Sequence, residues 1–315
     1  MRSKMARRNK RRPSSPFDPH HWPVWCLIGL LRILVLLPYR VQLAIGGALG
    51  ALMLRGARRR VRIARLNITR CFPALDAAAH EALLRAHFEA LGIMVMEIGL
   101  SWWGSDARLA KLARYEGLEH LEAALAQGRG AILLSAHFTP LEVGGRLMQQ
   151  RCRFHPMYKP SRNPVMEHVM RARRLAHYET LIRMDDVRQL MRSLRDNASV
   201  WYAPDQGFLG KGRLMVPFFG IDAPTNPATA RIARLTGAPV VPFFIHRLPG
   251  AAGYQLRLLP ALDGFPTDDP EADALRINQL IEAEVARTPE QYLWAHNRFK
   301  WSRDGSQRRC QSFEP

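Results

Sequence analysis

Apolar residues follow two different patterns along the chain. From about Arg55 to Leu112 they recur every three or four positions, most clearly between His80 and Trp103. This spacing places them on one face of a helix. After Gly117 the pattern changes to short apolar runs bounded by turn-forming residues, which are typical of strands buried on both faces. We therefore expect a helical part followed by a part that contains strands.

Four of the short apolar runs are predicted strands, and stretches between and around them have helical spacing. The strands are expected at Gly130–Ala136, Ser199–Ala203, Pro239–His246 and Tyr254–Pro260. The helices are expected at Glu119–Gln127, Pro164–Tyr178, Asp186–Arg195, Pro227–Thr236 and Pro270–Ala286. This alternation predicts an α/β fold with a mixed sheet flanked by helices.

One segment near the N-terminus is apolar over a much longer stretch. Between residues 24 and 54 the only charged side chains are those of Arg32 and Arg40. A single transmembrane helix is long enough to fit here, but Arg32 and Pro38 lie inside it. A shallow helical hairpin and helices in the interface are alternatives, and so is a helix buried in the protein core. We predict a membrane-attachment segment at 23–54 and leave its topology open.

Basic residues are concentrated around this apolar segment. The chain has 46 Lys and Arg residues against 27 Asp and Glu residues, a formal net charge of +19. Residues 1–70 contain 16 basic residues and the single acid Asp18, so they carry +15 and leave +4 for residues 71–315. Anionic lipid headgroups attract basic residues that flank an apolar segment. The charge therefore predicts a membrane partner.

Composition excludes several other classes of protein. With 47% hydrophobic and 23% charged residues, most of the chain is expected to fold. Cys26, Cys71, Cys152 and Cys310 have neither a C-x-x-C pair nor metal-ligand spacing, so no disulfide framework and no metal site are expected. Basic and aromatic residues do not alternate as in nucleic-acid binding modules, so no nucleic-acid partner is predicted.

The stretch SAHFTPLEVGG, residues 135–145, contains the clearest candidate chemistry. His137 follows a predicted buried strand, which places it at the edge where open α/β sheets bind ligands. A histidine titrates near neutrality and can take a proton from a hydroxyl. Glu142 follows five residues later, and a carboxylate on the other ring nitrogen would fix the tautomer and stabilise the imidazolium. The pair predicts activation of a substrate hydroxyl.

A purely structural role competes for the same residues. Thr139 and Glu142 have the spacing of a capping box, with Pro140 at the first helical position. In that alternative Glu142 only caps a helix.

Several sequence motifs along the rest of the chain, taken in order, point to one family of enzymes. The spacing of His137 and Glu142 resembles the His-x4-Asp/Glu motif of glycerolipid-type acyltransferases. Further blocks are Tyr158–Pro164, Trp201–Gln206, Val216–Gly220, Ala233–Gly237, Pro289–Trp294 and His296–Lys300. Together they are similar to the late acyltransferases of lipid A biosynthesis, the lauroyl/myristoyl transferase family. The resemblance extends from the apolar segment to about Lys300.

The resemblance implies roles for individual residues. His137 would be the general base and Glu142 its orienting partner, both catalytic. The residues implied in substrate binding are Arg174, Asp205, Lys159, Arg162 and Asn163. Lys159 stands where the family typically has Arg, whose planar guanidinium would bind a phosphate or carboxylate bidentately. No cofactor and no metal are implied.

Two of these assignments have simpler alternatives. Arg174 belongs to the run Arg171-Ala-Arg-Arg, which on its own is typical of a solvated helix face. Asp205 stands between Pro204 and Gln206 after a predicted strand, where an Asx turn explains it equally well.

The expected organisation is a basic N-terminal tail (1–22), a membrane-attachment segment (23–54), an acyltransferase catalytic domain (55–302) and a C-terminal tail (303–315). The implied reaction moves a fatty acyl chain from acyl carrier protein to a hydroxyl of a phosphorylated lipid A precursor, on an existing acyl chain. The implied location is the bacterial inner membrane, with the active site facing the cytoplasm. Alternatives are an acyltransferase for a glycerolipid, ornithine lipid or glycosylated phosphoinositide, and a non-enzymatic protein that binds membrane surfaces.

Overall fold

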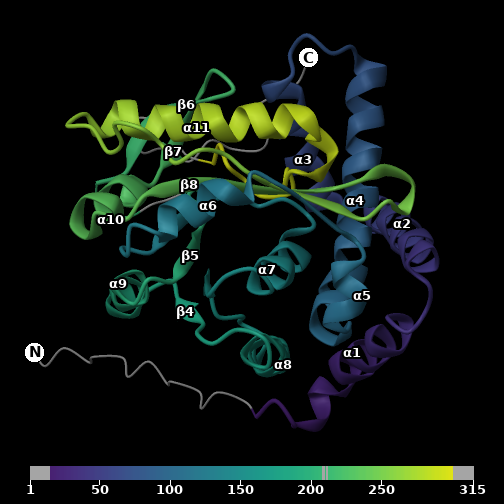
Figure 1. The fold of residues 1–315 in the computed structure, drawn as a ribbon. Coiled ribbons are helices and arrows are strands. Elements are labelled where there is room, and N and C mark those ends of the chain that lie inside the picture. The colour runs from purple at the N-terminus through teal and green to yellow at the C-terminus, as the bar shows by residue number, and fades with distance from the viewer. Residues whose placement is uncertain (1–14, 208–209, 211, 301–315) are drawn as a thin grey trace, which may run out of the picture.

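A seven-stranded sheet lies at the centre of the protein (Figure 1). This computed structural model describes residues 15–207, 210 and 212–300. The strands of the sheet are β1 (Ala113–Glu116), β2 (Ala131–Leu134), β3 (Phe154–Tyr158), β4 (Ile182–Arg183), β5 (Ser199–Tyr202), β8 (Val240–Arg247) and β9 (Tyr254–Leu258). Their order is β1–β9–β8–β2–β5–β3–β4, and β6 (Leu214–Phe218) forms a separate hairpin with β7 (Ile221–Thr225).

Most of the sheet is parallel. Strands β8, β2, β5, β3 and β4 share one direction, whereas β9 and β1 run the other way. The pattern of apolar runs predicts β2, β5, β8 and β9. It does not predict β3, which contains Pro156, or β1, in which Arg114 and Glu116 are exposed. The expected mixed sheet flanked by helices is confirmed.

Helices cover both faces of this sheet (Figure 1). They are α1 (Trp22–Leu34), α2 (Tyr39–Gly56), α3 (Arg58–Cys71), α4 (Ala77–Trp103), α5 (Asp106–Ala110), α6 (Leu118–Leu125), α7 (Leu141–Gln149), α8 (Pro164–Leu175), α9 (Val187–Arg195), α10 (Ala228–Thr236) and α11 (Pro270–Arg287). Three short 3-10 turns are η1 (Pro19–His21), η2 (Pro249–Ala251) and η3 (Pro289–Gln291). All five helices predicted after Gly117 are present, and none of their ends differs from the prediction by more than three residues.

The core divides into two clusters because successive strand residues point to opposite faces of a sheet. On one face Leu134 belongs to a cluster with Phe88 of α4 and Ile281 of α11. On the other face Leu133 belongs to a cluster with Leu147 of α7. Burial on both faces explains why the sequence of β2 is continuously apolar.

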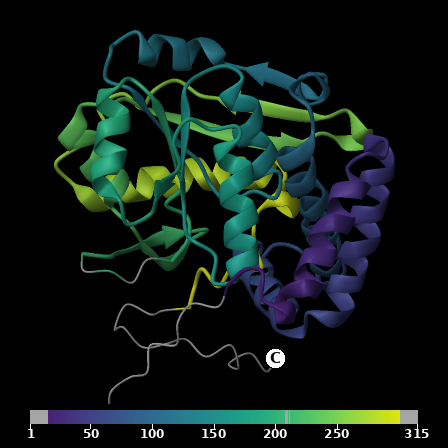
Figure 2. The ribbon, with the colours of Figure 1, turned by 90° about the horizontal axis from the view of Figure 1, so that it is seen from below.

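The predicted membrane-attachment segment forms two helices and not one. Helix α1 ends at Leu34, and α2 begins after Pro38, which has no backbone N–H to continue a helix. Among the described residues, no helix combines the length and the apolar character needed to cross a bilayer. Figure 2 shows α1 and α2 at the periphery of the protein. Most of the predicted tail 1–22, and all of the tail 303–315, lie outside the described residues.

Helix α2 approaches α4 very closely. Gly46 and Gly50 of α2 face Gly92 of α4, and a Cβ atom added to Gly92 would lie 2.1 Å from the Gly46 carbonyl oxygen and 2.2 Å from the Gly50 nitrogen. Only glycine allows the two backbones to come this near. Helix α2 is thus packed onto the protein, whereas no residue of α1 is buried.

A buried histidine on α4 makes the fold sensitive to acid. His87 is fully buried, its Nδ1 lies 3.1 Å from the Glu290 carbonyl oxygen, and burial lowers its pKa to about 4. The unfolded chain binds a proton near pH 6.5, so it takes up protons before the folded chain does. The stability that neutral His87 contributes is therefore complete above pH 6.5 and is lost as the pH falls towards 4.

We expect the free energy of unfolding to fall by roughly 3 kcal/mol from this source between pH 6.5 and pH 4. Urea denaturation of His87→Gln, which cannot titrate here, should show a fall smaller by that amount. The exposed His20→Gln variant serves as control and should match the unchanged protein. Equal pH slopes for all three proteins would contradict the assignment.

Candidate active site

The candidate base lies where the sequence places it, just beyond a central strand. Strand β2 ends at Leu134, and His137 follows in the short connection to α7. The side chain of His137 is 25% exposed, and the edge of its ring approaches the Trp201 ring with 5.8 Å between centroids. The imidazole is thus held in one orientation and remains open to a substrate.

A buried carboxylate from the neighbouring strand contacts this imidazole. Asp205 follows β5, which pairs in parallel with β2, so the two residues meet at the same edge of the sheet. His137 Nδ1 lies 2.6 Å from Asp205 Oδ1, and the backbone N–H of His137 donates to Oδ2 at 3.0 Å. Asp205 is 2% exposed. One carboxylate therefore binds both the ring and the backbone of His137.

The protonation of the pair follows from the surroundings of Asp205. Burial alone would raise the pKa of this carboxyl, but the charge and hydrogen bonds of His137, with the nearby Arg298, lower it to about 2. An ionised carboxylate can only accept hydrogen bonds, so Nδ1 carries a proton. In the neutral imidazole Nε2 is then the acceptor, and it has no hydrogen-bond partner among the described residues.

Two residues behind Asp205 were assigned no role from the sequence. The Arg298 side chain is buried and donates to the Pro224 carbonyl oxygen at 3.0 Å and to Thr225 Oγ1 at 3.1 Å. The hydroxyl of Tyr292 interacts with Asp205, and burial raises the pKa of Tyr292, so the phenol stays neutral. Both residues lie in the C-terminal blocks of the resemblance, which was the one signal available.

The structure does not place Glu142 against His137. Glu142 lies in the first turn of α7, where Arg174 Nε donates to Oε1 at 2.9 Å and Nη2 donates to Oε2 at 2.5 Å. Trp102 Nε1 also donates to Oε1 at 2.9 Å. The predicted contact with the imidazole is wrong, because Asp205 occupies Nδ1 and α8 brings a guanidinium to Glu142. A catalytic role of Glu142 stays a prediction.

The capping alternative is also wrong. The N-cap of α7 is Pro140, no side chain caps the helix, and the buried Thr139 hydroxyl has no partner among the described residues. Burial alone would raise the pKa of Glu142, but Arg174 outweighs burial and lowers it. Burial alone would lower the pKa of Arg174, but Glu142 raises it. Glu142 and Arg174 form a charged pair in which Glu142 is 13% exposed and Arg174 is 18% exposed.

The other three predicted binding residues lie together in the connection from β3 to α8. Asn163 caps α8, since its Oδ1 accepts from the backbone N–H groups of Val165 and Met166 at 3.0 and 3.1 Å. Lys159 and Arg162 are exposed. Because β3 is parallel to β5, this connection starts at the edge of the sheet that carries Asp205. Substrate binding by the three residues stays a prediction.

The connection that carries His137 is fixed by the segment after α11. The Thr139 N–H donates to the Gln291 carbonyl oxygen at 2.8 Å, and the Leu293 N–H donates to the His137 carbonyl oxygen at 3.0 Å. Phe138 and Tyr292 form a β-bridge between these two hydrogen bonds. The backbone of the candidate base is thus held from both sides.

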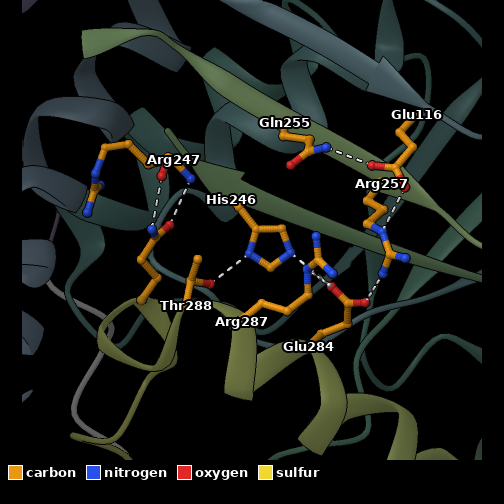
Figure 3. Close-up of polar contacts among 9 residues, drawn as sticks. Glu116, His246, Arg247, Gln255, Arg257, Glu284, Arg287 and Thr288 are labelled. Atoms are coloured by element: carbon orange, nitrogen blue, oxygen red, sulfur yellow. Dashed lines mark hydrogen bonds and ion pairs between the residues drawn. The ribbon is translucent and has the colours of Figure 1, made fainter. Parts of the chain in front are cut away.

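A polar network in turn ties that segment to the sheet (Figure 3). His246 of β8 lies with Nδ1 2.7 Å from Thr288 Oγ1 and with Nε2 3.0 Å from Glu284 Oε2. Arg257 binds both Glu284 and Glu116. The His246 ring also meets the edge of the Phe138 ring, with centroids 5.3 Å apart. The network therefore supports the site without belonging to it.

These features match the geometry that enzymes with a general base require. The site has a partly exposed imidazole oriented by an ionised carboxylate, at the ligand-binding edge of a mostly parallel sheet.

Comparison with known proteins identifies the family to which the chain belongs. The chain belongs to the family described as "Bacterial lipid A biosynthesis acyltransferase", which it matches over residues 11–301. It is therefore an acyltransferase of lipid A and lipopolysaccharide biosynthesis, as the resemblance implied.

Characterised relatives cover nearly the whole chain. The chain is 36% identical to the lipid A biosynthesis palmitoleoyltransferase of Escherichia coli (strain K12), over 90% of this chain and 92% of that protein. It is 35% identical to the lauroyltransferase of the same organism, over 91% and 94%. It is 27% identical to the myristoyltransferase, over 91% and 90%.

Among solved structures, the 1-acyl-sn-glycerophosphate (LPA) acyltransferase PlsC from Thermotoga maritima matches 74% of this chain and 98% of its own. The TM-score is 0.36 and the identity is 13%. A likeness at this level supports no conclusion about the site.

Proposed function

We propose that this enzyme transfers a fatty acyl chain from the thioester of acyl carrier protein to a hydroxyl of a phosphorylated lipid A precursor, on an existing acyl chain. The observation that carries the proposal is the pair formed by His137 and Asp205, in which Nδ1 holds a proton and Nε2 is left to accept one. A hydroxyl on the substrate then makes a nucleophile on the protein unnecessary.

The reaction proceeds by direct attack. His137 Nε2 takes the proton of the acceptor hydroxyl as its oxygen forms a bond to the thioester carbonyl carbon. The carbonyl oxygen becomes an oxyanion in the tetrahedral intermediate. When the carbonyl re-forms, the carbon–sulfur bond breaks and the thiolate takes the proton from the imidazolium. Asp205 stabilises that imidazolium, so the step needs a buried carboxylate at Nδ1.

We assign Arg174 the role of a positively charged donor to substrate oxygen atoms. Two of the three guanidinium nitrogens of Arg174 donate to Glu142. The third, Nη1, donates to no group in the described part of the chain. The hydrogen bond from a preorganised donor to a developing oxyanion, or to a phosphate of the acceptor, is stronger in a site from which water is excluded. Glu142 then acts as a positioning residue that fixes the plane of the guanidinium.

We further propose that α1 lies on the cytoplasmic surface of the bacterial inner membrane. Trp22, Leu27, Leu30 and Ile33 of α1, with Leu36 just after it, are between 51% and 79% exposed, and basic residues are concentrated on both sides of the segment 23–54. An exposed apolar stripe next to basic residues is typical of helices that rest in a lipid interface. Such seating would bring a lipid acceptor to the site.

An acyl-transfer assay tests the reaction. The protein is mixed in detergent with a series of acyl carrier proteins that carry chains of different length, and with a tetra-acylated disaccharide bisphosphate precursor. We expect mass spectrometry to show the gain of one acyl group from at least one donor. The gain should disappear with an acceptor that lacks free hydroxyls on its acyl chains. No gain with any donor, or transfer only to a glycerolipid, would contradict the proposal.

A further inference from the structure

A small pocket lined by cationic and aromatic side chains lies between α1 and α8. Its volume is about 230 Å³. Helix α1 contributes Trp25 and Arg32, α8 contributes His168 and Arg173, and Trp103 lies at the end of α4. None of the described residues that line the pocket is acidic. Helices α1 and α8 are neighbours at the periphery of the protein (Figure 1).

The two guanidinium groups of this pocket have no polar partner among the described residues. Neither Arg32 nor Arg173 forms a hydrogen bond or an ion pair with another described residue. Their neighbour Arg174 differs, since its charge is matched by Glu142. Two unmatched guanidinium groups at one small pocket favour an anion, and a phosphate can accept bidentate hydrogen bonds from each.

Contacts between aromatic rings hold the residues on one side of the pocket in place. Phe17 stacks on Trp25 with 5.8 Å between ring centroids and an interplanar angle of 9°. His168 meets the edges of both rings, with centroids 5.4 Å from Phe17 and 6.1 Å from Trp25. Val169, which also lines the pocket, is buried in a cluster of apolar residues. The pocket is therefore part of the packed structure.

The position of Arg32 on α1 indicates where the anion comes from. Arg32 lies one turn beyond Ile28 and two turns beyond Trp25, so these three residues share the face of α1 that meets α8. The exposed apolar residues Ile33, on α1, and Leu36, just beyond its end, adjoin this face. In an interface, charged lipid headgroups lie directly at the border of the apolar layer. Arg32 is at that border.

From this placement we propose that the pocket between α1 and α8 binds the phosphate headgroup of an anionic membrane phospholipid, held between Arg32 and Arg173. The inference rests on the proposed seating of α1 in the membrane surface. A phospholipid is favoured over the acceptor because the pocket is continuous with the helix face that would lie in the bilayer. The bound lipid would fix α1 and α8 relative to the membrane.

Vesicle flotation with the full-length protein tests this site. Vesicles of phosphatidylcholine alone are compared with vesicles that also contain phosphatidylglycerol. Phosphatidylglycerol should increase binding at least tenfold, and the double variant Arg32→Gln/Arg173→Gln should lose most of that increase. The control Arg171→Gln/Arg188→Gln has the same net charge, removes two exposed arginines outside the pocket, and should keep most of it. Equal losses in both double variants would overturn the proposal.

Two further experiments distinguish lipid binding in the pocket from membrane binding by α1 and from binding of the acceptor. Replacing Leu30 and Ile33 with Glu should abolish binding to both kinds of vesicle, and persistent binding would show that α1 is not seated. Acyl transfer in detergent without phospholipid should be unchanged in Arg32→Gln/Arg173→Gln. A KM for the phosphorylated acceptor raised tenfold there would assign the pocket to the acceptor and overturn the proposal.

Discussion

Replacing Asp205 with Asn is expected to lower the rate constant of acyl transfer by about 10³- to 10⁴-fold, with little change in KM. The amide is nearly the same size but has no charge to stabilise the imidazolium, and its N–H₂ group can turn the imidazole to the wrong tautomer. Because Asp205 binds both the ring and the backbone N–H of His137, no other described group can replace it. Single-turnover transfer, followed by mass spectrometry, measures this effect.

The Asp205 experiment needs proof that the protein stays folded. Asp263→Asn, at an exposed position, is the matched control and should transfer acyl chains at the unchanged rate. Thermal unfolding of Asp205→Asn should remain cooperative. A folded Asp205→Asn enzyme that works within about tenfold of the unchanged rate would show that the carboxylate does not assist His137.

The second large effect is expected at the pair formed by Glu142 and Arg174. Glu142→Gln leaves a mostly buried guanidinium without its counter-charge, which should lower the free energy of unfolding by about 2–4 kcal/mol and also slow transfer. The exposed pair of Glu179 and Arg153 offers a control, because Glu179→Gln should cost at most about 1 kcal/mol. Urea denaturation measures both changes.

A double variant separates stability from catalysis at this pair. Glu142→Leu/Arg174→Met replaces both charges with apolar side chains, so most of the lost stability should return. Transfer should stay slow, because Nη1 of Arg174 is then missing as a donor to substrate. Recovery of both stability and transfer would mean that the pair only supports the fold.

The sequence predicts the strands that are buried on both faces, and it fails where that pattern is broken. Strand β2 is a continuous apolar run, β5 and β8 each contain several adjacent apolar residues, and β9 is apolar at alternate positions. In the five residues of β3, His155 and Pro156 separate Phe154 from the apolar pair Met157 and Tyr158, and β4 has only two residues. Neither strand has a run of apolar residues long enough to be recognised in the sequence.

The candidate base was found because its signal is local, whereas its partner required the order of the strands. His137 and Glu142 are close in sequence, which favoured a direct contact between them. Asp205 is 68 residues from His137 and reaches it because β2 and β5 are parallel neighbours. Both strands were predicted, but apolar runs alone do not reveal which strands pair. Likewise the sequence did not show that Arg174 would point to Glu142.

The most direct test of the account is the single-turnover rate of acyl transfer by folded His137→Ala, with acyl carrier protein as donor and the tetra-acylated precursor as acceptor. General-base catalysis typically contributes 10²- to 10⁴-fold, and His137 also orients the hydroxyl, so we expect a loss of about 10⁴-fold. Transfer within about tenfold of the unchanged enzyme would contradict the account, because His137 could not then be the base.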